Sequence, residues 1–280
     1  MTETIERSVL PKHLSSSAAT MFNQCPQRWK LRYVDRLADP PGIPALVGTL
    51  AHRVLELLLN EPAEQRSQAR ARELATNAWA EISDHNDFVG LGLDTEGVRG
   101  FKWQAWHAIV GLWALEDPSA VGVVATEQRI EADLEGVPFL GVVDRVDKAG
   151  EEVVVTDYKS GKLPHALRTE EKLDQVLLYA AAIDATTDLH PARARLLYLG
   201  AKVIEVAVTP AAVQRAVTRL ASTWSSLNDR HSEDHFPPKT GPLCGWCPFI
   251  ERCPEGMAEI RSRVAEGRVP AHAPALRLVA

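Results

Sequence analysis

The spacing of apolar residues follows two different periods along the chain, and the change comes near residue 120. Before that point, apolar positions recur at helical spacing, most clearly in the segment that contains Val47, Leu50, Val54 and Leu58. A breaker rich in proline and glycine precedes this segment. The helices predicted in the first part are residues 14–33 with Ser15 or Ser16 as N-cap, 45–60, and 62–116 with an interruption at 84–100.

After residue 120, short apolar segments separated by turn residues predict a strand-rich block. Glu135-Gly136 and Ala149-Gly150 supply turns between the first three. The predicted strands are residues 121–130, 137–146, 152–158, 194–199 and 203–208, and helices are predicted at 170–184, at 210–230 and near the end. Three strands, a crossover helix and further strands predict an α/β layer architecture with a mixed sheet.

Composition adds limits to this picture. Apolar residues make up 45% of the 280 residues and charged residues 24%, which is an ordinary globular balance. Apolar runs such as Leu57–Leu59 are far too short to span a bilayer. The segment Met1–Pro11 carries Glu3, Glu6 and Arg7 and lacks the apolar stretch of a signal peptide. We therefore expect a cytoplasmic protein without a membrane partner.

The formal net charge of −6 argues weakly against a nucleic-acid partner, although a site that holds divalent cations must itself be acidic. A run of like charges is most often a solvated face. No G-x-x-x-x-G-K-[ST] or G-x-G-x-x-G motif occurs, so no nucleotide cofactor is expected. Local basic clusters are Arg28, Lys30, Arg32 and Arg36, and Lys159, Lys162, Arg168 and Lys172.

Two predicted strands carry charges on otherwise apolar faces. Asp157 and Lys159 share a strand face with Val153 and Val155, and Asp144 stands in a second apolar strand. A charge on such a face is costly unless it is paired or binds a metal. Two converging carboxylates would suit Mg²⁺ or Mn²⁺. The alternative is a simple ion pair at a sheet edge, and for an isolated D-x-K that alternative is the better one.

Four motifs in order change this balance. They are Gly48-Thr49-Leu50-Ala51-His52, G-V-V-D-R-V-D ending at Asp147, V-T-D-Y-K-S-G-K ending at Lys162, and Q-V-L-L-Y from Gln175 to Tyr179. Together they resemble the PD-(D/E)xK nuclease superfamily, and more narrowly its RecB-type nuclease domains. The resemblance extends from about Leu14 to Pro254. It implies a restriction-endonuclease-like core of order αβββαβ with a mixed central sheet.

The resemblance also implies a role for each residue. His52, Asp144, Asp157 and the backbone carbonyl of Tyr158 match metal ligands, and Lys159 matches the catalytic lysine. Gln175 and Tyr179, four residues apart on one helix face, match residues that line the site toward DNA. Glu127 matches a further acidic position near the metal, and a solvent-facing strand residue is an equal alternative for it. Taken alone, His52 would be better read as a core histidine.

The chain has only four cysteines, Cys25, Cys244, Cys247 and Cys253. In a cytosolic protein their number favours metal ligation over disulfides, and by count it suits zinc and an iron–sulfur cluster equally. A redox C-x-x-C or simple buried thiols are further alternatives. One cysteine upstream and three clustered downstream resembles the iron–sulfur RecB-like nucleases, among them the AddB nuclease domain and the CRISPR adaptation nucleases. This resemblance implies a structural [4Fe–4S] cluster.

We therefore expect one nuclease domain over residues 1–280, with a helical insertion at about 62–116, a nuclease core at about 119–230 and a cluster lobe from 14–36 and 236–262. The expected activity is that of a Mg²⁺- or Mn²⁺-dependent DNA exonuclease acting on single strands or ends, in repair or recombination. A helicase or repair protein could be a partner, but the sequence does not identify one. The alternatives are a non-catalytic DNA-end binding or CRISPR-type adaptation subunit and a zinc-stabilised interaction module.

Overall fold

The computed structural model describes residues 9–279. Glu3, Glu6 and Arg7, on which the expectation about a signal peptide partly rests, lie outside the described residues. The chain divides into two compact units. We call them the sheet unit (Pro41–Glu135 and Phe139–Thr218) and the cysteine unit (Met1–Pro40, Gly136–Pro138 and Arg219–Ala280). No helix in residues 9–279 is long and apolar enough to cross a membrane.

A five-stranded mixed sheet forms the centre of the sheet unit, with its strands in the order β1-β2-β3-β4-β5. β2 and β3 are antiparallel, β3 and β4 are parallel, and β4 and β5 are antiparallel. The α/β prediction and the mixed sheet are confirmed. The strands are β1 (Gly122–Leu134), β2 (Val137–Ala149), β3 (Glu152–Lys159), β4 (Pro191–Tyr198) and β5 (Lys202–Ala207).

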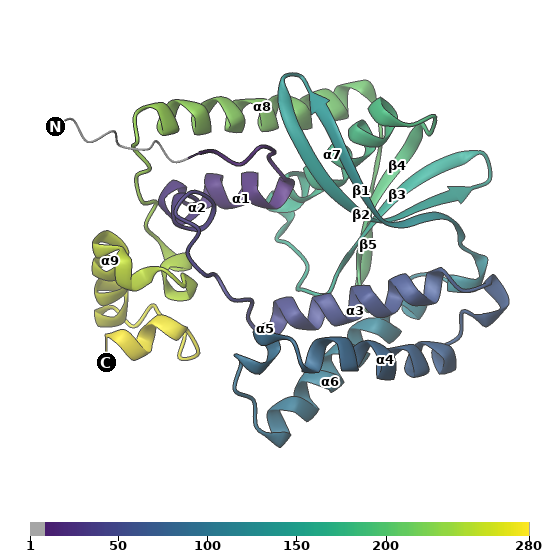
Figure 1. Cartoon of the computed structure of the whole chain (residues 1–280), viewed down its shortest axis with the longest axis horizontal. Helices are drawn as coiled ribbons and strands as arrows, with labels where there is room; N and C mark the ends of the chain where they lie inside the picture. Colours follow the sequence, from purple (N-terminus) through teal and green to yellow (C-terminus); the bar gives the residue numbers. More distant parts are fainter. Residues whose placement is uncertain (1–8, 280) are drawn as a thin grey trace. The chain divides into compact units, whose positions relative to one another are not determined.

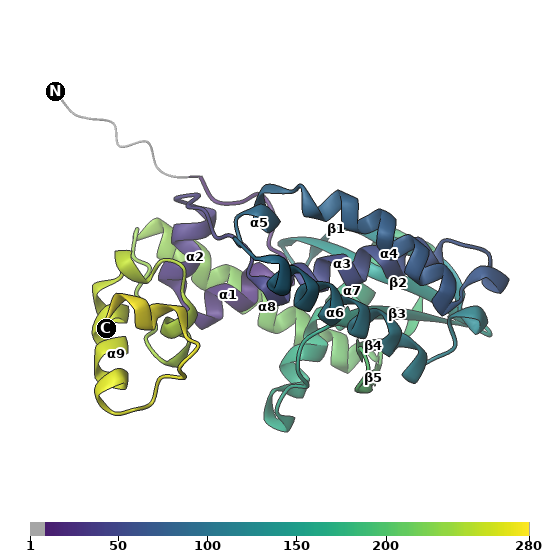
Figure 2. The same cartoon turned by 90° about the horizontal axis from the view of Figure 1, so that it is seen from below.

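Helices cover both faces of this sheet (Figure 1). The parallel pair β3 and β4 requires a crossover, and α7 (Thr169–Thr186) supplies it. α7 packs on the face that carries Asp157, since Gln175 of α7 donates to that carboxylate. On the other face, Tyr158 and Leu197 join the apolar core formed by three helices. These are α3 (Ile43–Leu59), α4 (Gln68–Ser83) and α6 (Thr95–Val110), which lie next to one another in Figures 1 and 2.

α3 is the central helix of that layer because one broad stripe of its residues is apolar. Leu50, Val54 and Leu58 are buried, while His52 on another side remains partly accessible. The interruption predicted at residues 84–100 is shorter in the structure. It contains a one-turn helix, α5 (Asn86–Val89), and ends where the Asp94 side chain caps α6 by accepting from the Gly97 N–H.

In the cysteine unit, the predicted single helix over residues 14–33 is wrong, because the chain forms α1 (Ser16–Gln24) and α2 (Pro26–Tyr33) instead. They are separated at Cys25, whose backbone is extended (φ −161°, ψ 106°). Pro26 causes this break, since proline disfavours the α conformation in the residue before it. The predicted cap is confirmed, with Ser15 accepting from the Ala18 N–H. The remaining helices are α8 (Pro210–Ser232), which runs across the boundary of the two units, and α9 (Pro254–Ala265).

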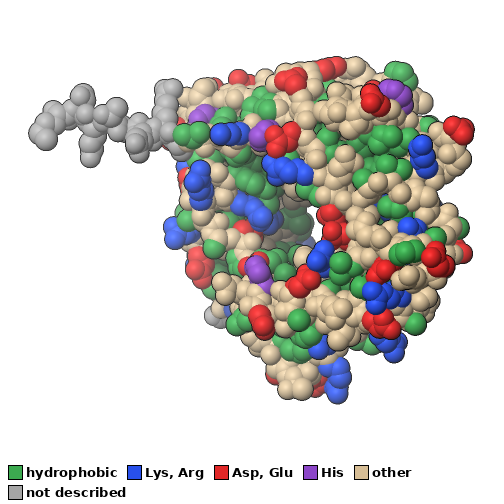
Figure 3. Space-filling view, turned by 45° about the vertical axis from the view of Figure 1, so that its right-hand side comes forward, with side chains coloured by type: hydrophobic (Ala, Val, Ile, Leu, Met, Phe, Trp, Pro, Cys, Tyr) green, Lys and Arg blue, Asp and Glu red, His purple; other side chains and the backbone are tan. Residues whose placement is uncertain are grey.

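The charges on the molecular surface are mixed in sign. On the face seen in Figure 3, Lys and Arg side chains lie among Asp and Glu side chains. The net charge of −6 therefore does not describe every part of the surface, and local basic groups remain available to an anionic ligand.

Candidate active site

The candidate site lies where β2 and β3 diverge. Their antiparallel register ends with the pair Arg145 and Thr156. Asp144 and Asp157 are the next residues beyond this pair, and they are 9% and 3% exposed. At this fork the Tyr158 backbone N–H donates to Asp144 Oδ2 at 2.6 Å. Both carboxylates are thus fixed in a sheltered position that strand pairing does not fill.

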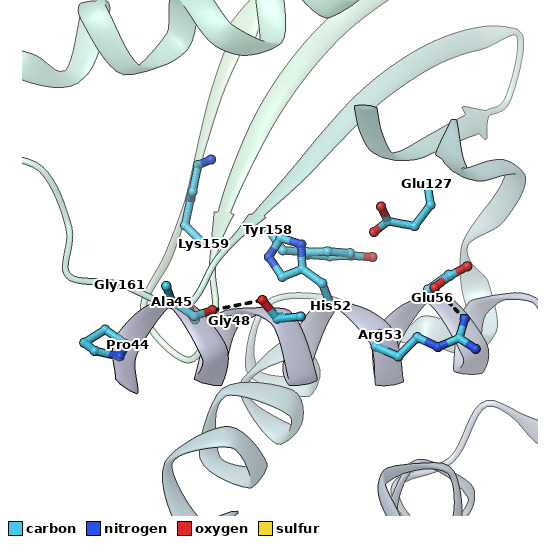
Figure 4. Close-up of a pocket in the computed structure, with 12 residues that line it drawn as sticks. Pro44, Ala45, Gly48, His52, Arg53, Glu56, Glu127, Tyr158, Lys159 and Gly161 are labelled. Carbon is cyan, nitrogen blue, oxygen red and sulfur yellow. Dashed lines mark hydrogen bonds and ion pairs between the residues drawn. The ribbon is translucent and has the colours of Figure 1, made fainter. Parts of the chain in front are cut away.

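Three side chains from three elements converge beside this fork. The nearest ligand atoms of His52 from α3, Glu127 from β1 and Asp144 from β2 all lie within 4.8 Å of one another. Figure 4 shows the His52 ring and the Glu127 carboxylate facing the same space. His52 Nδ1 is 3.4 Å from Asp144 Oδ2. One nitrogen and carboxylate oxygens form a donor set that fits Mn²⁺ or Mg²⁺.

Glu127 has an unusual backbone conformation and a raised pKa. Its φ of 46° lies in the left-handed region, which a non-glycine residue inside a strand rarely adopts. Burial and then the charge of Asp144 raise the pKa of Glu127 to about 7. For His52, burial acts to lower the pKa, but the hydrogen bond and charge of Asp144 outweigh it, so this pKa is raised. Both raised pKa values show that the negative charge of the site is unfavourable in the metal-free protein. A bound cation would offset that charge.

Asp157 belongs to a second group, formed with Lys159 and α7. Lys159 Nζ lies 2.6 Å from Asp157 Oδ2 and donates to Gln175 Oε1 at 2.9 Å. Gln175 Nε2 donates to Asp157 Oδ1 and to the Tyr179 hydroxyl, each at 2.9 Å. The Lys159 contact lacks hydrogen-bond geometry, so the buried Asp157 Oδ2 is left with no hydrogen bond from the described residues. That oxygen is therefore held by the ion pair with the Lys159 ammonium.

The structure therefore brings the sequence-predicted residues together in two adjoining groups. His52, Glu127 and Asp144 form the ligand group, and Asp157, Lys159, Gln175 and Tyr179 form the lysine group. The two are joined at the fork, where Asp144 and Asp157 follow the last strand pair. His52, Glu127 and Lys159 also line one cavity of about 700 Å³ (Figure 4). The Tyr158 carbonyl as a ligand remains a prediction.

Two glycines make room for these groups. A Cβ on Gly141 would lie 2.7 Å from Cε1 of Tyr179, and one on Gly48 would lie 3.0 Å from Ser160 Oγ. At Gly141 a Cβ would force the Tyr179 ring to move, whereas at Gly48 the Ser160 hydroxyl would need to shift by only a few tenths of an ångström. Sequence reasoning used both glycines as motif letters and missed this steric role. A glycine inside an apolar strand is the signal that could have shown it.

A buried charged network behind the fork was also missed. Arg145 is fully buried, and its Nη1 donates to the Tyr158 hydroxyl and to Glu116 Oε1, each at 2.6 Å. Its Nε lies 2.7 Å from Asp147 Oδ1. Arg195 contacts Glu116 and Asp147 as well, at 2.9 and 3.1 Å. Burial acts to lower the pKa of Arg145, but these neighbours raise it, so the cation persists.

In the cysteine unit, all four cysteines line one small cavity, and all are free thiols. The Lys239 N–H donates to Cys25 Sγ at 3.4 Å and the Gly256 N–H to Cys253 Sγ at 3.2 Å. Within residues 9–279, however, the tight group of potential ligand atoms is the one at His52, and no three sulfurs come within 4.8 Å of one another.

The comparisons with known proteins agree with this geometry. The sequence model of the PD-(D/E)XK nuclease superfamily matches residues 13–254. The chain belongs to this superfamily, whose members use divalent metal ions.

Two individual proteins are also similar to the chain. One is the Gene 69 protein of Mycobacterium phage L5, which is 22% identical over 302 residues, covering 91% of this chain and 99% of the phage protein. The other is a crystal structure from Eubacterium rectale, provisionally named an exonuclease. It has 12% identity and a TM-score of 0.48, over 81% of this chain and 84% of that one.

Proposed function

We propose that the chain is a Mg²⁺- or Mn²⁺-dependent deoxyribonuclease of the RecB-like kind that cuts single-stranded DNA from an end, in repair or recombination. One observation carries this proposal. A histidine and carboxylate ligand group and a lysine held by Asp157 and Gln175 adjoin at one strand fork, with His52, Glu127 and Lys159 open to one cavity. Membership of the PD-(D/E)XK superfamily supports the same activity.

His52, Glu127 and Asp144 would hold the metal ion, with Asp157 Oδ2 at the adjoining position. The ion supplies a Lewis acid that stabilises negative charge developing on the phosphate. Lys159 adds a positive charge beside it, and Asp157 and Gln175 fix the direction of its Nζ. From there the ammonium can orient an attacking water and offset charge on the phosphate.

The Gln175 amide holds the other three side chains of the lysine group in place. Its oxygen accepts from Lys159 while its nitrogen donates to Asp157 and Tyr179, so the amide fits in one orientation only. This makes Gln175 a positioning residue that holds both a cation and an anion in place. The arrangement is built before substrate arrives, as electrostatic catalysis requires.

For the cysteine unit, we propose a structural [4Fe–4S] cluster held by Cys25, Cys244, Cys247 and Cys253. Four sulfur donors line one cavity, and backbone N–H groups already point at two of them. A zinc ion bound by thiolates at about 2.3 Å would bring the sulfurs to roughly 3.8 Å apart. Within residues 9–279 no three cysteine sulfurs come within 4.8 Å of one another, so their spacing is not that of a zinc site.

The test is cleavage of 5′- and 3′-labelled single-stranded and duplex DNA with Mn²⁺ or Mg²⁺. We expect single strands to be shortened progressively, with Lys159→Ala slower by about 10²- to 10³-fold. Lys202→Ala, which removes an exposed lysine of β5, is the matched control and should cut normally. If the wild type leaves all these substrates intact while still binding DNA, the non-catalytic end-binding alternative replaces the proposal.

A further inference from the structure

A second cavity in the sheet unit, unconnected with the candidate site, lies in the groove between α4 and α6. Its volume is about 250 Å³. Leu50, Ala105 and Ile109 give it an apolar floor, while Trp79 and Trp106 form aromatic walls. Arg72 and Lys102 complete the lining. Apolar and aromatic walls with a few convergent polar groups are the usual composition of a ligand site.

The two cations are held in an unusual way, by indole rings on the opposite helix. The Arg72 guanidinium of α4 lies 4.8 Å from the ring centroid of Trp106 on α6. Reciprocally, the Lys102 ammonium of α6 lies 4.0 Å from the ring centroid of Trp79 on α4. Cation–π contact orients a cation without neutralising it. Among residues 9–279, no carboxylate pairs with Arg72 or Lys102, so both charges remain available to an anion.

The Trp79 wall is fixed before any ligand binds. Trp79 contacts Phe88 edge to face at 5.0 Å between centroids, and Phe101 at 5.9 Å. Phe88 and Phe101 are themselves buried and lie 4.9 Å apart. A rigid indole loses little entropy when another flat ring packs on it, which favours an aromatic ligand.

We propose that this groove binds a nucleotide of the substrate strand, with its phosphate at Arg72 and Lys102 and its base against the indoles and the apolar floor. The proposal rests on the nuclease function proposed above. α3 relates the groove to the candidate site, since Leu50 floors the groove and His52, two residues on, points to the metal group. Two residues turn a helix by about 200°, so the cavities lie on opposite sides of a helix about 10–12 Å thick. A substrate strand that occupies both must therefore pass around this helical layer, so we assign the groove to a nucleotide beyond the one at the metal group.

The test measures binding separately from cleavage. Anisotropy of a fluorescent oligothymidylate is followed in EDTA, where no metal supports hydrolysis, at several salt concentrations. For the Arg72→Ala/Lys102→Ala double variant we expect affinity to fall at least about tenfold. Its salt dependence should flatten by about 0.7 in log–log slope, because the one phosphate that Arg72 and Lys102 neutralise together contributes about 0.7 to that slope on a single strand.

Arg99→Ala is the matched control, because Arg99 lies on α6 only three residues before Lys102, is exposed and pairs with Glu96. It should leave affinity and slope nearly unchanged. Trp106→Leu should weaken binding about tenfold while keeping the wall apolar. Equal decreases in affinity for Arg99→Ala and the double variant, or an unchanged slope in the double variant, would overturn the groove as a binding site.

Two further measurements complete the test. The first asks whether the groove binds a strand or a free nucleotide, and the second distinguishes failure of the groove proposal from failure of the proposed nuclease function. Thymidine monophosphate should compete only weakly, since we assign the groove to a strand rather than to a free nucleotide; strong competition contradicts that assignment. With Mn²⁺, the double variant should cut a dinucleotide at the wild-type rate and a long oligonucleotide more slowly. A wild type that binds the oligonucleotide through the groove but never cuts refutes the proposed function alone.

Discussion

Glu127 combines two unfavourable features at one position. Its left-handed backbone costs on the order of 1 kcal/mol or more, and its carboxyl has a pKa raised to about 7 by burial and by Asp144. Such costs persist where the surrounding structure fixes them and where function uses the result. A bound cation would offset the second cost directly, since it favours the ionised carboxylate.

This protonation predicts how the metal-free protein responds to pH. The folded-state pKa values of Glu127 and Asp157 are raised, chiefly by burial, above the values of an unfolded chain. The stability these carboxyls contribute is therefore complete below about pH 4 and is lost as pH rises through about 7. We expect the melting temperature in EDTA to fall by a few degrees between pH 5 and pH 8, measured by calorimetry.

Glu127→Gln should flatten that decline, because the amide does not ionise. Saturating Mn²⁺ should raise the melting temperature of the wild type more at pH 8 than at pH 5.5, since protons compete with the ion. A metal-free melting temperature that rises across this range would contradict the protonation argument.

Gly141 gives a second prediction at the residue scale. Gly141→Ala would place a methyl group 2.7 Å from Tyr179 Cε1, so the ring must move and its hydrogen bond with Gln175 is strained. We expect a decrease of about 1–3 kcal/mol in unfolding free energy and a lower kcat. Gly100→Ala is the control, because a Cβ there meets nothing within 4 Å. Equal melting temperatures and rates for the two variants would show that Tyr179 needs no such space.

At the scale of elements, the site depends on where β2 and β3 separate. α3 was predictable because its apolar residues follow a helical period, and the strands because short apolar segments rich in valine lie between turn residues. The break at Cys25 was readable from Pro26 but was overlooked. The network at Arg145 was not predictable, since Glu116 and Arg195 come from distant segments that only the fold brings together. The same holds for the approach of Glu127 to His52.

In the charged network, we expect Arg145 to support metal binding and Arg195 to support stability. Tyr158 holds Asp144 through its N–H and packs edge to face on His52, with 5.7 Å between ring centroids. Arg145 fixes Tyr158 through the hydroxyl. Tyr158→Phe removes that one bond, so we expect Mn²⁺ affinity, measured by calorimetric titration, to fall about tenfold or more.

Arg195→Gln is the control for this variant. Arg195 contacts Glu116, Asp147 and Thr156 in the same network, whereas the Tyr158 hydroxyl is held by Arg145. The substitution should lower the melting temperature, because partly buried ion pairs with Glu116 and Asp147 are broken, while leaving Mn²⁺ affinity close to that of the wild type. If both variants lose affinity in proportion to stability, the network supports the fold and has no particular role at the metal group.

At the scale of the whole molecule, the two compact units carry different chemistry. The sheet unit contains the candidate site and the α4–α6 groove, and the cysteine unit contains the four thiols. The cysteine unit joins segments from both ends of the chain, and a group bound to Cys25 and Cys244 would close a loop of more than 200 residues. In loop-closure terms, one such cross-link is worth about 5 kcal/mol.

Removal of that group should therefore affect the two units unequally. We expect protein purified without oxygen to contain iron and sulfide and to absorb visible light, and Cys25→Ser to lose the absorbance. Hydrogen exchange should then lose protection in α1, α2 and α9, while β3 and β4 at the centre of the sheet keep theirs, because their pairing needs no sulfur ligand. Thr240→Ala, which alters a neighbouring residue of the same cavity, is the control and should retain both iron and protection. Stoichiometric zinc without iron or sulfide would contradict the cluster but preserve the unequal response, whereas unchanged exchange in Cys25→Ser would show that the thiols hold no structural group.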